Sequence, residues 1–104
     1  MTEAEFQDRV IATARLYGWM VHHARPARMA DGRWRTPVQG DKGFPDLVLA
    51  HTRHGRVFAE LKSDTGRLTP EQKAWLSVLG GVVWRPRDWP HVLAVLQGKE
   101  IQVG

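Results

Sequence analysis

Apolar residues recur along the chain at two spacings, and these spacings predict its helices and strands. The first helix is predicted over residues 3–17, where one stripe is apolar. That stripe contains Phe6, Val10, Ala14 and Tyr17. Thr2 and Glu5 have the spacing of a capping box, in which each side chain bonds the backbone N–H of the other residue. Gly18 is predicted to end the helix.

Two more helices are predicted in the second half of the chain. Thr69 is a predicted N-cap, with Pro70 at the first helical position and Gln72 completing a second capping box. The predicted buried stripe of this helix is Ala74, Trp75, Val78 and Leu79. A last helix is predicted to open at Asp88 or Trp89 and to precede a short C-terminal tail.

Short apolar runs between these helices predict four strands, over residues 19–23, 45–52, 56–62 and 82–84. Residues 53–55 (Arg-His-Gly) fit a three-residue hairpin loop. Residues 25–43 are rich in glycine and proline and are predicted to form one long loop. The predicted order is α-β-β-β-α-β-α, an α/β fold. Because the strands are apolar on both faces, helices are expected on both sides of the sheet.

Composition adds few constraints to this picture. The 104 residues suffice for one domain, and no apolar run has the length of a membrane span. The N-terminus is acidic, so no secretory signal is expected, and the absence of cysteine excludes disulfides and thiolate metal sites. The expected compartment is the cytoplasm.

The net charge is +4, and basic residues gather in the long loop. The candidate nucleic-acid-binding residues there are Arg25, Arg28, Arg33, Arg35, Lys42 and the aromatic Trp34. Arginines interleaved with an aromatic residue are typical of a nucleic-acid contact. A solvated loop with surface arginines would have the same composition, so the pattern alone leaves both interpretations open.

The hairpin is the most informative part of the chain. With a loop at residues 53–55, paired residues have numbers that sum to 108, which places Asp46 opposite Lys62 and Glu60 opposite Val48. Since side chains alternate between faces, Asp46, Glu60 and Lys62 share one face at one end of the hairpin. The other face is predicted to be core and contains Leu47, Leu49, Val57, Ala59 and Leu61.

Two carboxylates and a lysine in one place can do phosphoryl chemistry. Asp46 and Glu60, with the backbone carbonyl of Leu61, could hold Mg²⁺, which prefers oxygen ligands. Lys62 could orient or deprotonate the attacking water and stabilise the transition state. The alternative is a purely structural cross-strand ion pair. A charged pair in a strand that otherwise looks buried disfavours that alternative.

Two further polar residues are candidates for the same site. Helical geometry places Glu3 on the apolar face of the first helix and Glu5 outside it, so Glu3 is a candidate metal ligand. A solvated acid matched to the helix dipole is the alternative for Glu3. Gln72 is a candidate for the edge of the site, and helix capping alone would also account for it.

Three segments together resemble a known group of enzymes. They are Gly43-Phe44-Pro45-Asp46-Leu47, Glu60-Leu61-Lys62 and Gly66-Arg67-Leu68-Thr69-Pro70-Glu71-Gln72. In these segments, and in its size and order of elements, the chain is similar to the PD-(D/E)XK nuclease superfamily. More narrowly, it looks like the stand-alone VRR-NUC domains of phages and bacteria, which resemble Holliday-junction resolvases.

The resemblance implies a restriction-endonuclease-like core, in which helices flank a central mixed β-sheet. It implies hydrolysis of DNA phosphodiesters with Mg²⁺ or Mn²⁺, with Asp46 and Glu60 on the metal, Lys62 catalytic and Gln72 beside them. It implies an acid in the first helix, which helical geometry assigns to Glu3. It also implies a homodimer that acts on branched DNA in a bacterium or in a phage-infected host cell. A non-catalytic nucleic-acid-binding module and a nuclease subunit that depends on a partner remain the alternatives.

Overall fold

A computed structural model describes residues 1–23, 27–28, 32, 34–35 and 40–101. Its helices are α1 (Glu3–Leu16), α2 (Pro70–Leu79), the 3₁₀ turn η1 (Pro86–Asp88) and α3 (Trp89–Leu96). Its strands are β1 (Met20–His23), β2 (Ala27–Arg28), β3 (Trp34–Arg35), β4 (Leu47–His51), β5 (Gly55–Leu61) and β6 (Val82–Trp84). Both predicted capping boxes are present, one at Thr2 with Glu5 and the other at Thr69 with Gln72.

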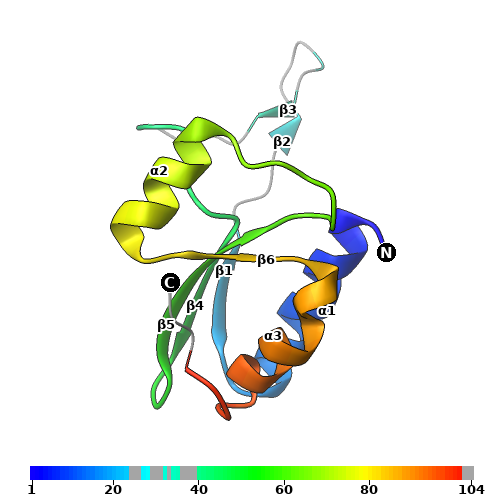
Figure 1. The fold of residues 1–104 in the computed structure, drawn as a ribbon, viewed down its shortest axis with the longest axis vertical. Coiled ribbons are helices and arrows are strands. Elements are labelled where there is room, and N and C mark those ends of the chain that lie inside the picture. The colour runs from blue at the N-terminus through cyan, green and yellow to red at the C-terminus, as the bar shows by residue number, and fades with distance from the viewer. Residues whose placement is uncertain (24–26, 29–31, 33, 36–39, 102–104) are drawn as a thin grey trace.

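The main sheet has the strand order β1-β4-β5-β6 (Figure 1). β1 and β5 both pair antiparallel with β4, whereas β6 pairs parallel with β5. The sheet is therefore mixed and flanked by helices. This confirms the predicted α/β class and is compatible with the predicted restriction-endonuclease-like core. The prediction of one loop over residues 25–43 was wrong, because β2 and β3 form a separate two-stranded ribbon within it.

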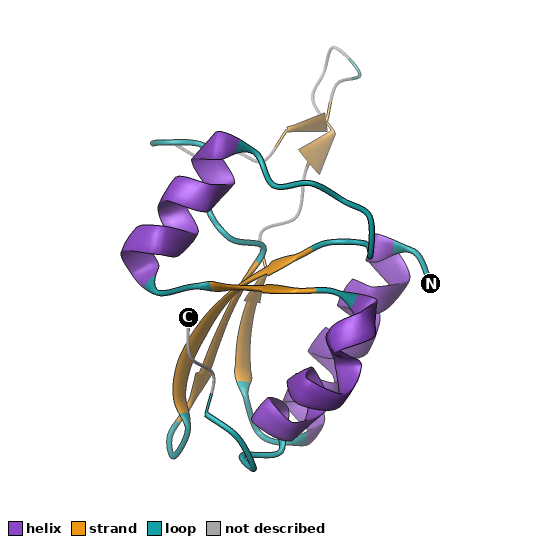
Figure 2. Ribbon diagram, viewed as in Figure 1, coloured by secondary structure: helices purple, strands orange, loops and turns teal. Residues whose placement is uncertain are grey.

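One face of the sheet carries most of the core. Helices α1 and α3 lie side by side against this face (Figure 2). The predicted inward residues of the hairpin are all buried there: Leu47, Leu49, Val57, Ala59 and Leu61. They meet Phe6, Val10 and Ala14 of α1 and Val92, Val95 and Leu96 of α3. Tyr17 was predicted in the buried stripe but is 38% exposed, because it is the C-cap of α1 and lies beyond the last full turn.

Helix α2 lies across the opposite face of the sheet and covers only part of it. Within α2 only Leu76 is buried, and Gly81 packs closely against Leu76 and Phe58. The predicted buried stripe was wrong: Val78 is 87% exposed, and Ala74 is exposed. A helix that meets a sheet at one edge buries a narrower stripe than its sequence offers. On the uncovered part of this face Met20 is 68% exposed.

The hairpin register also differs from the prediction. Paired residues have numbers that sum to 106, with Leu49 opposite Val57 and His51 opposite Gly55. The loop is therefore Thr52–His54, and Gly55 opens β5 with a φ of +81°, a value that favours glycine. Moving the partner by two residues leaves every side chain on its predicted face. In the described part of the chain, no helix is both long and apolar enough to span a membrane.

Candidate active site

The corrected register brings the two predicted acids closer than the sequence suggested. Continued one step past the end of β4, it places Asp46 opposite Glu60. The Oδ2 atom of Asp46 accepts a hydrogen bond from the backbone N–H of Leu61 at 2.9 Å. The Asp46 carboxylate thus accepts a hydrogen bond from β5 as the carbonyl of a neighbouring strand would. This bond fixes the orientation of the Asp46 side chain at the open end of the hairpin.

Glu60 is the only charged residue among the described ones that is buried, with 2% of its surface exposed. Its Oε1 atom accepts a hydrogen bond from Nε2 of Gln72 at 3.1 Å. Its Oε2 atom has no hydrogen-bond partner in the described part of the protein. Buried carboxylate oxygens are normally satisfied, so this oxygen marks a position where a proton or a cation belongs.

The pKa of Glu60 is raised from 4.5 to about 8, and burial is the largest cause. The neighbouring carboxyl of Asp46 also contributes to the rise, because a protonated Glu60 can donate a hydrogen bond to Asp46, whereas an ionised Glu60 is repelled by the charge of Asp46. The charge of Lys62 acts in the opposite direction and lowers this pKa, while the charge of Glu3 raises it. Three predicted site residues therefore lie close enough to Glu60 for their charges to change its pKa: Asp46, Lys62 and Glu3.

Gln72 makes two contacts that match its two predicted positions, one in the capping box and one with Glu60. Its Oε1 atom accepts from the backbone N–H of Thr69 at 2.9 Å, which completes the capping box of α2. Its Nε2 atom donates to Glu60. The two interpretations that the sequence left open are thus not exclusive, because the two ends of one amide serve the helix and the acid.

The segment before Asp46 is held against the start of α2. Gly43 has a φ of +97°, and a Cβ built there would come within 2.7 Å of the backbone carbon of Glu71. The ring of Phe44 meets Trp75 edge to face at 5.1 Å, and Trp75 Nε1 donates to the Lys42 carbonyl at 3.0 Å. Trp75 was predicted to be core; it instead attaches the Asp46 segment to α2.

The donor set fits a hard divalent cation. Mg²⁺ takes one or two carboxylates together with carbonyls and waters, and Asp46, Glu60 and the Leu61 backbone supply that chemistry. Glu3 is exposed, and no group of three acidic or histidine side chains close enough to share an ion occurs in the described residues. Glu3 therefore influences Glu60 through its charge without joining a preformed three-acid cluster. Figure 1 shows the segment after β5 reaching toward the N-terminal end of α1, where Glu3 lies.

The predicted nucleic-acid-binding residues are only partly described. Arg25 and Arg33 lie outside the described residues. Arg28, Trp34 and Arg35 have backbone positions in the β2–β3 ribbon, and their side chains are not described. Lys42 is 83% exposed in its side chain and pairs with Glu71 at 3.5 Å. An ion pair this exposed to solvent is weak, so Lys42 remains accessible to a phosphate.

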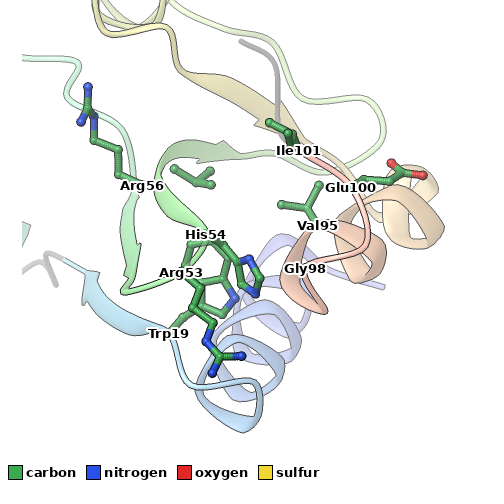
Figure 3. Close-up of a pocket in the computed structure, with 9 residues that line it drawn as sticks. Trp19, Arg53, His54, Arg56, Val95, Gly98, Glu100 and Ile101 are labelled. Atoms are coloured by element: carbon green, nitrogen blue, oxygen red, sulfur yellow. The ribbon is translucent and has the colours of Figure 1, made fainter.

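A cavity of about 330 Å³ lies at the other end of the hairpin, away from the acids (Figure 3). It is lined by the hairpin loop, Trp19 and the segment after α3. In Figure 3 the guanidinium groups of Arg53 and Arg56 point in different directions, with the ring of His54 between the hairpin and Gly98. These groups do not converge on one point, so the cavity has no cluster of polar groups comparable with the acids at the open end of the hairpin.

Comparison with known families bears directly on this arrangement. The family model of the VRR-NUC domain matches residues 21–83, which is more than half of the chain. The chain belongs to the VRR-NUC family. No curated protein and no solved structure gives a significant match.

Family membership confirms the resemblance to VRR-NUC domains and makes this a nuclease-type domain. The matched VRR-NUC segment contains Asp46, Glu60, Lys62 and Gln72, whereas Glu3 and α3 lie outside it. One polar residue near the site was missed by sequence reasoning. Arg85 follows β6, two residues beyond the matched segment, and binds the loop that follows Lys62. No motif or periodicity marked it.

Proposed function

We propose that this VRR-NUC domain is a metal-dependent endonuclease that hydrolyses DNA phosphodiester bonds, with a preference for branched or flapped DNA. The observation that carries the proposal is Glu60, a buried acid whose second oxygen has no partner among the described residues and which lies opposite Asp46. A domain that only bound nucleic acid would gain nothing from a buried acid facing a phosphate.

Asp46, Glu60 and the Leu61 carbonyl would hold Mg²⁺ or Mn²⁺. Such a cation, when bound, acidifies a water and neutralises charge on the phosphate. A cation held there would offset the raised pKa of Glu60, because its charge favours the ionised acid, whereas burial and Asp46 disfavour it.

The remaining groups have roles that follow from their contacts. Gln72 holds Oε1 of Glu60, so the other oxygen is presented to the cation. Asp46 is oriented by the Leu61 N–H. The amine of Lys62 is close enough for its charge to act on Glu60, so it can hydrogen-bond the attacking water or a phosphate oxygen of a substrate in the same place.

The preference for branched DNA and a homodimeric state rest on the likeness to resolvase-like members of the family. Two copies of one site would suit a substrate with two strands to cut. A nuclease subunit that needs a partner for targeting is the second candidate.

The test is cleavage of labelled four-way, flapped and linear duplex DNA with Mg²⁺, Mn²⁺ or EDTA, comparing the natural protein with Lys62→Ala. Metal-dependent cutting that falls by about 10³-fold in the variant supports the proposal. Arg53→Ala, a change at the exposed hairpin loop, serves as the matched control and should cut normally. Retained DNA binding without any cutting would overturn the proposal in favour of a binding module or a partner-dependent subunit.

A further inference from the structure

Arg85 holds the loop that follows the predicted catalytic lysine. One guanidinium nitrogen, Nη1, donates to the carbonyl of Ser63 and to the carbonyl of Gly66, both at 2.7 Å. The side chain is half-buried, so these bonds are only partly exposed to competition from water. Two short hydrogen bonds from a charged donor are stronger than the loop's own Gly66-to-Ser63 backbone bond of 3.2 Å.

The loop in turn contacts the side chain of Lys62. A Cβ built at Gly66 would lie 3.4 Å from Cδ and 3.5 Å from Cβ of Lys62, so the Gly66 backbone lies along the lysine stem. The backbone N–H of Lys62 donates to the carbonyl of Trp84 at 3.1 Å. Lys62 is therefore held at its backbone by Trp84 and along its stem by a loop that Arg85 fastens.

Arg85 is itself held in place. Its backbone N–H donates to Oδ2 of Asp88 at 2.9 Å, within the η1 turn. It directly follows Trp84, which is buried and ends the parallel strand β6. The fastening point thus belongs to the rigid part of the fold, while the loop it fastens has no regular structure.

From this geometry we infer that Arg85 is a positioning residue for Lys62: it fixes the 63–66 loop and thereby the place of the lysine amine beside Asp46 and Glu60. The inference about the loop stands on the contacts alone, and its consequence for catalysis rests on the proposed nuclease function. Small displacements of a catalytic group can cost about 10²-fold in rate, so the loss of this fastening should be measurable.

The first test needs no activity. Arg85→Met keeps the apolar stem and removes the donors, and Arg87→Met is the matched control, since exposed Arg87 donates to Asp64 of the same loop at 3.1 Å. Amide hydrogen exchange at residues 63–66 should be about tenfold faster or more in Arg85→Met, and close to natural in Arg87→Met. Exchange that is equally slow in both variants, with the fold intact, overturns the inference.

The second test uses DNA cleavage under single-turnover conditions and at steady state. Arg85→Met should lower kcat by about 10- to 100-fold and change KM by less than about threefold, and Arg85→Lys should recover part of the loss. In a Lys62→Ala background, Arg85→Met should cost almost nothing, because the group it positions is gone. An equal loss in both backgrounds would show a general structural role and overturn the inference.

The two proposals fail in different ways. If the natural protein cuts no DNA with any metal, the nuclease function fails, while hydrogen exchange still decides whether Arg85 fixes the loop. If the natural protein cuts and Arg85→Met cuts at the natural rate, the nuclease stands and the role of Arg85 is refuted. Gly66→Ala crowds the Lys62 stem without removing the donors of Arg85, and it should also lower kcat.

Discussion

The two ends of the β4–β5 hairpin are built in opposite ways. At the tip, the rings of His51 and His54 stack at 4.3 Å and lie against Trp19, whose Nε1 donates to the Leu96 carbonyl at 2.9 Å. Both ring nitrogens of His51 have hydrogen-bond partners there, and Trp19 is buried. At the open end, Glu60 is buried with an oxygen that lacks a partner in the described structure. The tip of the hairpin stabilises the fold, whereas the open end contains a buried acid that lowers stability.

The largest effect should come from neutralising the buried acid. Glu60→Gln keeps the shape and removes the charge, and we expect a loss of cleavage of about 10³-fold or more because the cation loses an anionic ligand. The metal-free protein should be as stable as the natural one, or more stable, above pH 7, since an ionised buried acid no longer has to be accommodated. Single-turnover cleavage and urea unfolding measure the two quantities. A Glu60→Gln protein that cuts normally would remove Glu60 from the site.

Trp19→Ala tests the opposite end of the hairpin. Trp19 is 4% exposed and packs in the core, so truncation should lower the free energy of unfolding by about 3–5 kcal/mol. The cleavage rate of the molecules that remain folded should not change, because Trp19 lies at the far end from the acids. Urea unfolding and cleavage at low temperature separate the two. A rate that falls in a fully folded variant would show that the two ends are coupled.

Gly43→Ala should weaken the acid end through its backbone. The new Cβ would collide with the backbone of α2, and a φ of +97° is strained for alanine, which together should cost about 1–3 kcal/mol. Cleavage should fall by about tenfold or more because the Asp46 segment must shift. The matched control is Gly40→Ala, where φ is +131° and no atom of the described residues lies within 4 Å of the added Cβ. Equal effects at the two glycines would mean that only the backbone strain matters.

The pH dependence of stability should be the most gradual effect, because it is spread over several pH units. The pKa of Glu60 is raised from the ordinary 4.5 to about 8, so the folded state binds this proton more tightly than the unfolded chain. The stabilisation is complete below about pH 4.5 and is lost as the pH rises toward 8, by at most about 1.4 kcal/mol per pH unit. In EDTA, urea unfolding at several pH values should show this slope, and Glu60→Gln should flatten it. Mg²⁺ should stabilise more at pH 8 than at pH 6, because it competes with the proton.

The composition of the acid end could be predicted from the sequence because strand periodicity is robust. The predicted register paired Asp46 with Lys62, whereas the structure sets Asp46 opposite Glu60. The error came from placing Gly55 in the loop when it opens β5. Because the error moved the partner by two residues, the face of each side chain was still right. The alternation of side chains along a strand can be predicted from neighbouring residues. The length of a turn depends on how the two strands pair, which neighbouring residues alone do not determine.

Other features could not be predicted because they depend on contacts between distant segments. Trp75 has an apolar ring at a helical position, and only the approach of Lys42 to α2 makes it a hydrogen-bond donor at the surface. Arg85 reaches Ser63 and Gly66 only because β6 pairs parallel with β5 and delivers its exit beside the exit of β5. The β2–β3 ribbon is too short for a periodic signal to emerge from its sequence.

The shared amide of Gln72 ties the assembly of the site to the integrity of a helix end. Helix termini fray, and each time the first turn of α2 opens, the bond from Thr69 and the bond to Glu60 lose the same partner. The fraction of time for which Glu60 is correctly held is therefore bounded by the local opening equilibrium of α2. A change far along that helix, with no atom near the acids, would alter the occupancy of the competent state before it altered any contact in the site.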